Sequence, residues 1–228
     1  MKRLAIIPAR SGSKELKDKN IHKLLGIPLS GYTIKAAVDS NIFDTVMFST
    51  DSEKYAEIAE NFGAEIPFLR SKDTSKDTST LWDVVKEVIC QYRKQGREFD
   101  LITLLQPTSP LRDAEDIIGA HKLFDEKDAN SVVSVCESEH SPLWSNIIKS
   151  DLSMECFAET DNIELCRQQL PIYYRLNGAI YIVNDKALDN INNMYTNKCY
   201  AYVMKQSHSI DIDTELDLVI AEAVMSAK

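Results

Sequence analysis

Two groups of residues near opposite ends of the chain have types and spacing that suit phosphate chemistry. In the first group a short apolar run leads into small and basic residues, which are Arg10, Ser11, Gly12, Ser13, Lys14, Lys17, Lys19 and Asn20. Small residues let the backbone approach an anion closely, and nearby cations neutralise its charge. A solvated basic loop fits the same residues, because the stretch contains neither a P-loop GK[ST] sequence nor GxGxxG. The spacing alone leaves both interpretations open.

The second group is a pair of carboxylates, Asp211 and Asp213, which are separated by Ile212. Residues two apart in an extended segment face the same side, so both carboxylates share one face. Such a pair suits a magnesium ion that bridges to substrate phosphates. The D-x-D spacing is also common by chance, with one Asp capping the following helix. Taken together with the basic loop, the pair favours the magnesium interpretation.

Four further charged residues are candidates for structural or binding roles. Asp51 follows an apolar run, and its spacing favours a role as the cap of the next helix. Arg112 either holds an anion or begins a helix, where its charge is unfavourable. Arg167 and Arg175 either bind a carboxylate or phosphate through a forked pair of hydrogen bonds or pair with nearby acidic residues. The absence of a G-x-S-x-G sequence argues against an α/β-hydrolase.

The composition indicates an ordinary globular protein whose partners are small molecules. Of the 228 residues, 44% are hydrophobic and 27% are charged. The 26 Lys and Arg against 35 Asp and Glu give a net charge of −9, which argues against nucleic acid or a membrane surface as a partner. Five cysteines without a CxxC spacing argue against a disulfide framework and a zinc site. No window approaches the roughly 20 apolar residues of a membrane span, so we expect a cytoplasmic protein.

Short apolar runs alternate with amphipathic segments along most of the chain. The runs predict strands at 3–8, 45–49, 65–69, 101–105, 131–135, 177–183 and 201–204, and the amphipathic segments predict helices at 29–39, 52–61, 81–93, 113–127, 186–190 and 215–225. This alternation predicts an α/β fold in which helices cover both faces of a mostly parallel sheet. The polar turns at 10–20, 50–51 and 106–112 are then expected at one sheet edge, where ligands bind in such folds.

Two segments depart from the alternation. The sequence SKDT occurs twice in succession over 71–78, and we interpret this segment as a mobile polar loop. The segment 137–176 is rich in apolar and aromatic residues without a regular period. It is either an inserted arm that packs on another subunit or a second layer folded onto its own domain. The sequence leaves both alternatives open.

Five motifs together resemble the acylneuraminate cytidylyltransferases, which include the CMP-sialic acid synthetases and relatives that act on other nonulosonic acids. The motifs are IIPARSGSK…KN at 6–20, LLQPTSPLR at 104–112, RQQLP at 167–171, RLNGAIY at 175–181 and SIDIDTELDL at 209–218. They span nearly the whole chain and occur in the order of that family.

The resemblance implies a three-layer, Rossmann-like nucleotidyltransferase fold formed by one domain over 1–228. It implies a homodimer in which segment 137–176 is the arm that reaches the partner and its substrate. The implied reaction transfers CMP from CTP to the anomeric hydroxyl of a nonulosonic acid and releases pyrophosphate, with Mg²⁺ as the cofactor. The implied pathway is cell-surface polysaccharide biosynthesis.

The resemblance also assigns roles to individual residues. The phosphates and the nucleotide are expected at Arg10, Ser13, Lys14, Lys19, Asn20 and Arg70. The sugar or the departing pyrophosphate is expected at Gln106, Arg167, Arg175 and Asn177. Magnesium is expected at Asp211 and Asp213. The catalytic residues are expected to be Arg10, Lys14, Lys19 and Asp211, and Asp211 is the candidate proton acceptor acting through the metal.

Three departures from the family's motifs concern the identity of the sugar. The segment 139–142 reads EHSP where neuraminate-specific members often have EHHP, Trp144 stands where some carry lysine, and Leu176 replaces the proline of RPNGAIY. N-acetylneuraminate, legionaminate and pseudaminate are therefore all candidate acceptors. Another cytidylyltransferase, for example for 3-deoxy-manno-octulosonate, and a non-catalytic nucleotide-binding module are the alternatives.

Overall fold

The computed structural model describes residues 1–13, 16–155, 157, 167–195 and 197–227. Its strands are β1 (Arg3–Pro8), β2 (Lys23–Leu24), β3 (Ile27–Pro28), β4 (Thr45–Ser49), β5 (Leu101–Leu105), β6 (Ser131–Glu137), β7 (Tyr174–Asn184) and β8 (Cys199–Met204). Its helices are α1 (Leu29–Asp39), α2 (Glu53–Glu60), α3 (Leu81–Lys94), α4 (Ala114–Glu126) and α6 (Glu215–Ser226). Short 3-10 helices are η1 (Lys19–Ile21), η2 (Pro142–Trp144), η3 (Arg167–Gln169), η4 (Asp185–Asn193) and η5 (Gln206–His208).

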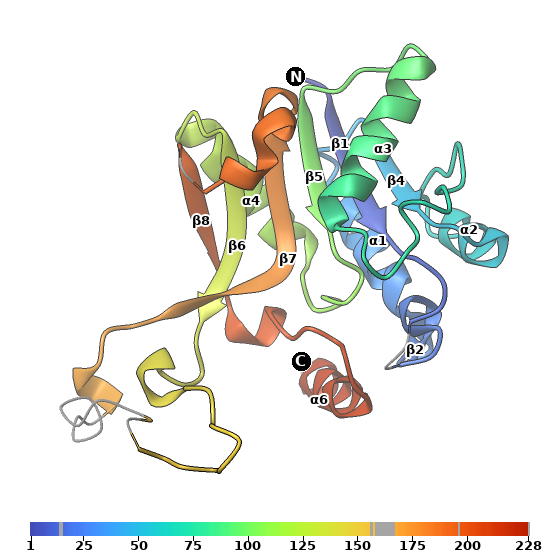
Figure 1. The fold of residues 1–228 in the computed structure, drawn as a ribbon. Coiled ribbons are helices and arrows are strands. Elements are labelled where there is room, and N and C mark those ends of the chain that lie inside the picture. The colour runs from blue at the N-terminus through green and yellow to red at the C-terminus, as the bar shows by residue number, and fades with distance from the viewer. Residues whose placement is uncertain (14–15, 156, 158–166, 196, 228) are drawn as a thin grey trace.

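The main sheet of the described chain has the strand order β4-β1-β5-β7-β6-β8 (Figure 1). β1 pairs in parallel with β4 and β5, and β6 pairs in parallel with β8. Only β7 runs antiparallel to its neighbours in this sheet of described residues. The mostly parallel sheet predicted from the sequence is therefore confirmed. The chain moves outward from β1 to β4 and then returns to β5 on the other side of β1, and such a reversal opens a crevice at the carboxyl ends of the two strands.

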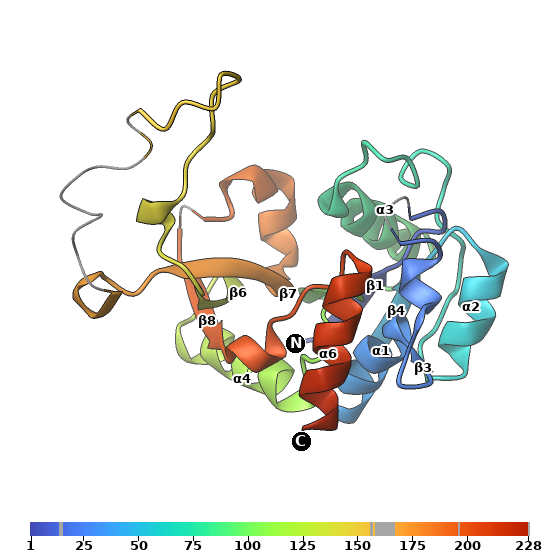
Figure 2. The ribbon, with the colours of Figure 1, turned by 90° about the horizontal axis from the view of Figure 1, so that it is seen from below.

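Alternate residues of β1 face two different helical layers. Ala5 and Ile7 lie in a core shared with α1, α2 and α4. Leu4 and Ile6 lie in a core shared with α3 and η4 on the opposite face. Figure 2 shows the sheet between these two layers. A strand covered on both faces needs apolar residues at every position, which explains the continuous apolar run.

The element boundaries mostly match those predicted, and their ends have clear causes. Ser52 caps α2 by accepting a hydrogen bond from the Tyr55 backbone N–H. Thr80 and Asp83 form a reciprocal capping box at the start of α3. Such caps satisfy backbone N–H groups that have no partner inside the helix. The predicted helix at 186–190 is instead the 3-10 helix η4.

The strand predicted at 65–69 is wrong. Glu65 forms a single bridge with Met47 at the edge of the sheet, and the chain then leaves β4. Pro67 lacks a backbone N–H and cannot donate to a strand ladder. The short hairpin of β2 and β3 was not predicted, and Leu25 and Gly26 both have positive φ at its turn. This combination of φ angles is typical of tight two-residue hairpin turns.

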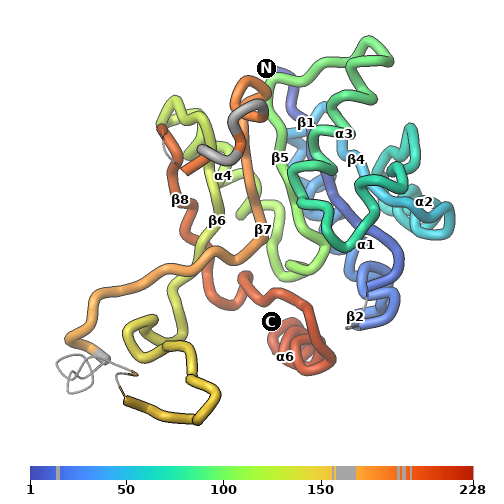
Figure 3. The backbone as a smooth tube through the Cα atoms, in the orientation of Figure 1, coloured from blue at the N-terminus to red at the C-terminus, as the bar shows by residue number. Residues whose placement is uncertain are grey.

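The described part of segment 137–176 projects beyond the sheet and does not cover it. β6 and β7 continue together to the pair Glu137–Tyr174, from which the segment extends away from the sheet (Figures 1 and 3). Several of its large apolar residues are exposed, with Ile147 at 89% and Leu152 at 76% of their full accessibility. Within the described residues, none of the helices is long and apolar enough to cross a membrane.

A neutral histidine is buried between the sheet and α4. His121 is 2% exposed, and its Nε2 lies 3.0 Å from the Thr103 hydroxyl of β5. Burial lowers the pKa of His121 to about 3, and the nearby positive charge of Arg3 acts in the same direction. The folded protein therefore holds an imidazole that cannot take up a proton near neutral pH.

This burial predicts that acid lowers the stability of the protein. In the unfolded chain the imidazole takes up a proton as the pH falls below about 6.5, whereas the folded chain resists protonation down to its depressed pKa. We expect His121 to lower the free energy of unfolding by about 2 kcal/mol between pH 8 and pH 5. Urea unfolding of the wild type and His121→Gln at both pH values measures this contribution. Equal pH dependence of the two proteins would contradict it.

Candidate functional site

A pocket of about 490 Å³ opens at the carboxyl ends of β1 and β5. This is the edge at which the strand order reverses and at which the polar turns were expected. Six of the residues singled out from the sequence line it together, which are Arg10, Ser13, Lys19, Asn20, Arg70 and Gln106. Its size is within the usual range of small-molecule sites.

The basic loop after β1 is fastened to the ends of β4 and α2. The Asp51 carboxylate accepts hydrogen bonds from the Ser11 backbone N–H at 2.7 Å and from its hydroxyl at 3.0 Å. Tyr55 donates to the Asp18 carboxylate at 2.8 Å. The prediction that Asp51 caps α2 is wrong, because Ser52 takes that position and Asp51 turns toward the loop. Because the Asp51 carboxylate accepts two hydrogen bonds from the loop, it restricts the conformations that the loop can adopt.

Two cations of the pocket pair with carboxylates from distant parts of the chain. Arg10 donates through Nη1 to Asp77. Lys19 donates through Nζ to Asp213 at 2.8 Å, which joins the N-terminal loop to the D-x-D segment. The sequence groups that lie nearly two hundred residues apart are therefore neighbours in space. Asn20 is buried and its side-chain amide donates to the Arg10 carbonyl at 3.0 Å, which shapes the loop between them.

Arg70 is a buried cation at the back of the pocket. Its guanidinium donates to the Ser49 carbonyl at 2.7 Å and to the Ser49 hydroxyl at 3.2 Å. Burial lowers the pKa of Arg70 to about 10, which leaves it charged at neutral pH. A desolvated, permanently charged group exerts a stronger field on an anion than a solvated one.

A second loop, at 106–112, holds the D-x-D segment in place. The Ile212 backbone N–H donates to the Thr108 carbonyl at 2.8 Å, between the two aspartates. The Arg112 side chain is 1% exposed. Its Nη1 donates to the carbonyls of Gln106 at 3.3 Å and Ala179 at 3.0 Å. Arg112 is therefore a structural residue that lies directly before the Asp113 N-cap of α4, in agreement with the helix-start interpretation.

The environment of Asp211 and Asp213 fits a divalent cation. Burial raises the pKa of Asp211, and repulsion by the Asp213 carboxylate adds to this, whereas a hydrogen bond with the Thr108 side chain opposes it. A cation bound by both carboxylates relieves their mutual repulsion. Gly178 lies beside them, since a Cβ added there would be 3.8 Å from Asp211 Oδ2 and 3.2 Å from Gln106 Nε2. The absence of a side chain at Gly178 thus leaves space beside the Asp211 carboxylate and the Gln106 amide.

Of the remaining residues predicted from the family resemblance, the structure describes the side chains of Arg175 and Asn177. Arg175 forms a bidentate pair with Glu139, at 2.9 and 3.2 Å, and its charge acts on Asp211 as well. Asn177 is 2% exposed. Its side-chain carbonyl accepts a hydrogen bond from the Ser134 hydroxyl at 2.6 Å, and its side-chain NH2 donates to the Ser209 hydroxyl at 2.9 Å. Lys14 and the side chain of Arg167 lie outside the described residues. The roles of all four residues stay predictions.

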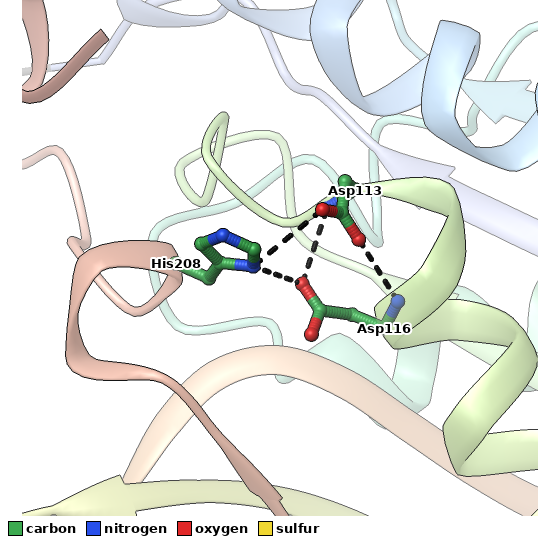
Figure 4. Close-up of side chains that lie close together, drawn as sticks. All are labelled: Asp113, Asp116 and His208. Atoms are coloured by element: carbon green, nitrogen blue, oxygen red, sulfur yellow. Dashed lines mark hydrogen bonds and ion pairs between the residues drawn. The ribbon is translucent and has the colours of Figure 1, made fainter. Parts of the chain in front are cut away.

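Behind the 106–112 loop lies a cluster of two aspartates and a histidine, which the sequence did not reveal (Figure 4). His208 Nδ1 lies 2.7 Å from Asp116 and 3.7 Å from Asp113. Asp113 and Asp116 are also the reciprocal capping box of α4, so each carboxylate already accepts a backbone hydrogen bond. The three ligand atoms lie within 4.8 Å of one another. The cluster connects η5, just before the D-x-D segment, to the start of α4.

Comparison with known proteins agrees with this architecture. The profile of a family described as cytidylyltransferase matches residues 4–221. A solved structure of CMP:2-keto-3-deoxy-manno-octonic acid synthetase in complex with CTP is similar over 100% of this chain and 99% of that chain. Its TM-score is 0.72 and its sequence identity 16%. At that identity the likeness demonstrates a common fold.

Two relatives are similar in sequence over nearly all of this chain. A CMP-N,N'-diacetyllegionaminic acid synthase of Legionella pneumophila is 37% identical over 229 residues, which cover 99% of this chain and 97% of the relative. An N-acylneuraminate cytidylyltransferase of Escherichia coli is 36% identical over 228 residues, 99% of this chain but only 52% of that protein. This chain thus spans about half the length of the second relative. By these matches and its five motifs, the chain belongs to the acylneuraminate-type cytidylyltransferase family.

Proposed function

We propose that this protein transfers CMP from CTP to the anomeric hydroxyl of a nonulosonic acid and releases pyrophosphate. The observation that carries the proposal is the 2.8 Å contact between Lys19, which lines the pocket together with Arg10, and Asp213 of the D-x-D segment. Nucleotidyl transfer needs the triphosphate neutralised and the acceptor hydroxyl held in line with the α-phosphorus. Cations that line the pocket, beside a neighbouring pair of carboxylates, would meet both needs.

The cations would bind the triphosphate. Arg10 and Lys19 reach the pocket from the first loop, and Arg70 supports it from behind. Negative charge accumulates on the departing pyrophosphate as the bond to the α-phosphorus breaks. Fixed cations lower the energy of that charge without having to reorganise, which is the main contribution a protein makes to this type of transfer. Lys14 would act with them.

Asp211 and Asp213 would hold magnesium. When bound, the metal would neutralise the phosphates and lower the pKa of the acceptor hydroxyl. Desolvation raises the pKa of Asp211, which makes its carboxylate the candidate proton acceptor. Asp213 is half-exposed and pairs with Lys19, so it lies on the triphosphate side. The two carboxylates therefore have different surroundings and would have different roles.

The acceptor sugar would lie on the other side of Asp211, toward Arg175 and Gln106. Arg175 acts electrostatically on Asp211 and holds Glu139 at the base of the projecting segment. A nonulosonic acid carries a carboxylate beside its anomeric carbon, and a forked guanidinium suits that group. The reaction would take place in the cytoplasm, where thiols such as those of Cys90 and Cys136 stay reduced.

Pyrophosphate release from each of the four nucleoside triphosphates tests the proposal. The acceptors would be N-acetylneuraminate, legionaminate, pseudaminate and 3-deoxy-manno-octulosonate, each with magnesium. We expect release with CTP and at least one nonulosonic acid, and the preferred sugar follows from the same experiment. CTP binding without release on any acceptor would support a non-catalytic nucleotide-binding protein instead.

The different surroundings of the two aspartates predict different losses on substitution. Asp211→Asn should lower kcat by about a hundredfold or more, because it removes both a metal ligand and the proton acceptor. Asp213→Asn should chiefly raise the magnesium concentration needed for half-maximal rate. Initial rates across a magnesium titration measure both effects. Full activity of Asp211→Asn would remove Asp211 from the mechanism.

We further propose that the segment 137–176 mediates a homodimer. Its described part carries exposed apolar side chains that do not pack on the sheet, namely Ile147, Ile148, Leu152, Met154 and Ile172. Exposed apolar groups gathered in one projecting segment are typical of a protein–protein contact. The base of the segment bears Glu139, the partner of Arg175, so the contact would form close to the acceptor side of the site.

The double variant Ile147→Glu/Leu152→Glu tests the dimer. Charges at these positions would have to be desolvated in an interface, so the mass in solution should fall from about twice to once the 25.8 kDa of the chain. Light scattering after size-exclusion chromatography measures this mass. Leu69→Glu, at an exposed apolar residue outside the segment, is the matched control. An unchanged mass for the double variant would place the interface elsewhere.

A further inference from the structure

The repeated SKDT sequence forms one wall of the pocket. The loop between Arg70 and α3 contains the copies 71–74 and 75–78, and it contributes Thr74, Lys76, Asp77 and Ser79 to the lining. The proposed reaction assigns no role to this loop. Its two copies have the same residues in the same order, so any difference between them arises from where the fold places each copy.

The first copy is fastened to α3. The Ser71 backbone N–H donates to Glu87 Oε1 at 2.9 Å, and the Thr74 hydroxyl donates to the other Glu87 oxygen. Glu87 lies in the middle of α3, which packs firmly on the sheet. The first copy therefore keeps the loop at the mouth of the pocket.

The second copy directs its charges differently from the first. Asp77 accepts a hydrogen bond from Arg10 Nη1 and lines the pocket. Its counterpart Asp73 is 87% exposed at the side chain and pairs with Lys76 at 2.8 Å, within the loop itself. Of the two equivalent aspartates, Asp77 alone reaches a cation that the proposed function assigns to the triphosphate.

A carboxylate and a phosphate cannot both occupy the same face of one guanidinium. Arginine binds either anion through the same forked set of N–H groups. An Asp77 carboxylate beside a bound triphosphate would also repel it, because both are negative. A triphosphate that binds the Nη1 face of Arg10 would therefore displace Asp77, and departure of pyrophosphate would allow the ion pair to form again.

We propose that Asp77 competes with phosphate for Arg10 and thereby sets the affinity of the pocket for CTP and for pyrophosphate. The inference rests on the proposed function and adds a residue that governs phosphate affinity. Because the competition acts on both ligands, it weakens substrate binding and also favours release of the product. The contact is partly solvated, with Arg10 at 33% and Asp77 at 46% side-chain exposure, so its effect is moderate.

The test is calorimetric titration of the wild type, Asp77→Asn and Asp73→Asn with inorganic pyrophosphate and, separately, with CTP. Magnesium is present throughout and no acceptor is added. We expect Asp77→Asn to bind both ligands about two- to fivefold more tightly than the wild type, because a neutral amide competes weakly for Arg10. Asp73→Asn, which changes the same residue in the other copy, should bind as the wild type does.

Two results would overturn the inference while leaving the proposed function intact. Weaker binding by Asp77→Asn would mean that the carboxylate contacts the bound ligand or its metal. Equal binding by Asp77→Asn and the wild type would mean that Arg10 binds phosphate without giving up Asp77. A wild type that binds neither ligand would instead overturn the proposed function itself. Thermal unfolding of each variant verifies that the proteins titrated are folded.

Discussion

The buried guanidinium of Arg112 joins the segments on which the site depends. It donates to the carbonyls of Gln106 in the 106–112 loop and Ala179 in β7, which brings the loop against the strand beside Gly178. Asp113 and Asp116 offset its charge, and Asp116 in turn holds His208 at 2.7 Å. His208 begins the segment that leads to Asp211. A buried charge is costly without hydrogen bonds and nearby opposite charges, so the Nη1 contacts and the two aspartates favour the arrangement in which these segments stay together.

The site built on this support is a balance of opposite charges. The N-terminal loop supplies cations, and carboxylates from three other segments contact this loop, namely Asp51, Asp77 and Asp213. Asp51 fixes the loop backbone, whereas Asp77 and Asp213 pair with the side chains that would bind phosphate. Charges that are paired in this way avoid mutual repulsion within the cationic loop. If these side chains bind phosphate and magnesium as proposed, binding would exchange partners, with a new contact replacing an existing ion pair.

The antiparallel direction of β7 explains how the segment 137–176 is inserted without disturbing the sheet. β6 and β7 are neighbours joined through the segment 137–176, and a connection between antiparallel neighbours can leave and re-enter at the same edge. β7 also separates the two parallel parts of the sheet and brings Gly178 next to Gln106. The same strand therefore contains Arg175, at the base of the segment 137–176, and Gly178, beside Asp211 and Gln106.

Much of this architecture follows from local patterns that sequence alone reveals. The apolar runs at 3–8 and 101–105 predicted strands buried on both faces, and they are β1 and β5. The alternation of strands and helices predicted a mostly parallel sheet with the basic loop and Gln106 at one edge. The five motifs indicated the family independently of the structure. These predictions succeed because periodicity and turn composition are properties of neighbouring residues.

Tertiary structure decided the pairings between distant residues. Asp51 holds Ser11 because the fold brings the first loop to the end of β4, and the adjacent Ser52 serves as the cap of α2. The two SKDT copies are identical in sequence, yet Asp77 meets Arg10 and Asp73 faces solvent. Arg112 gave no local sign of being buried. Sequence by itself determined the elements and the chemistry available to them, and the packing of strands and helices determined which charges meet, because a charge finds its partner through space and not along the chain.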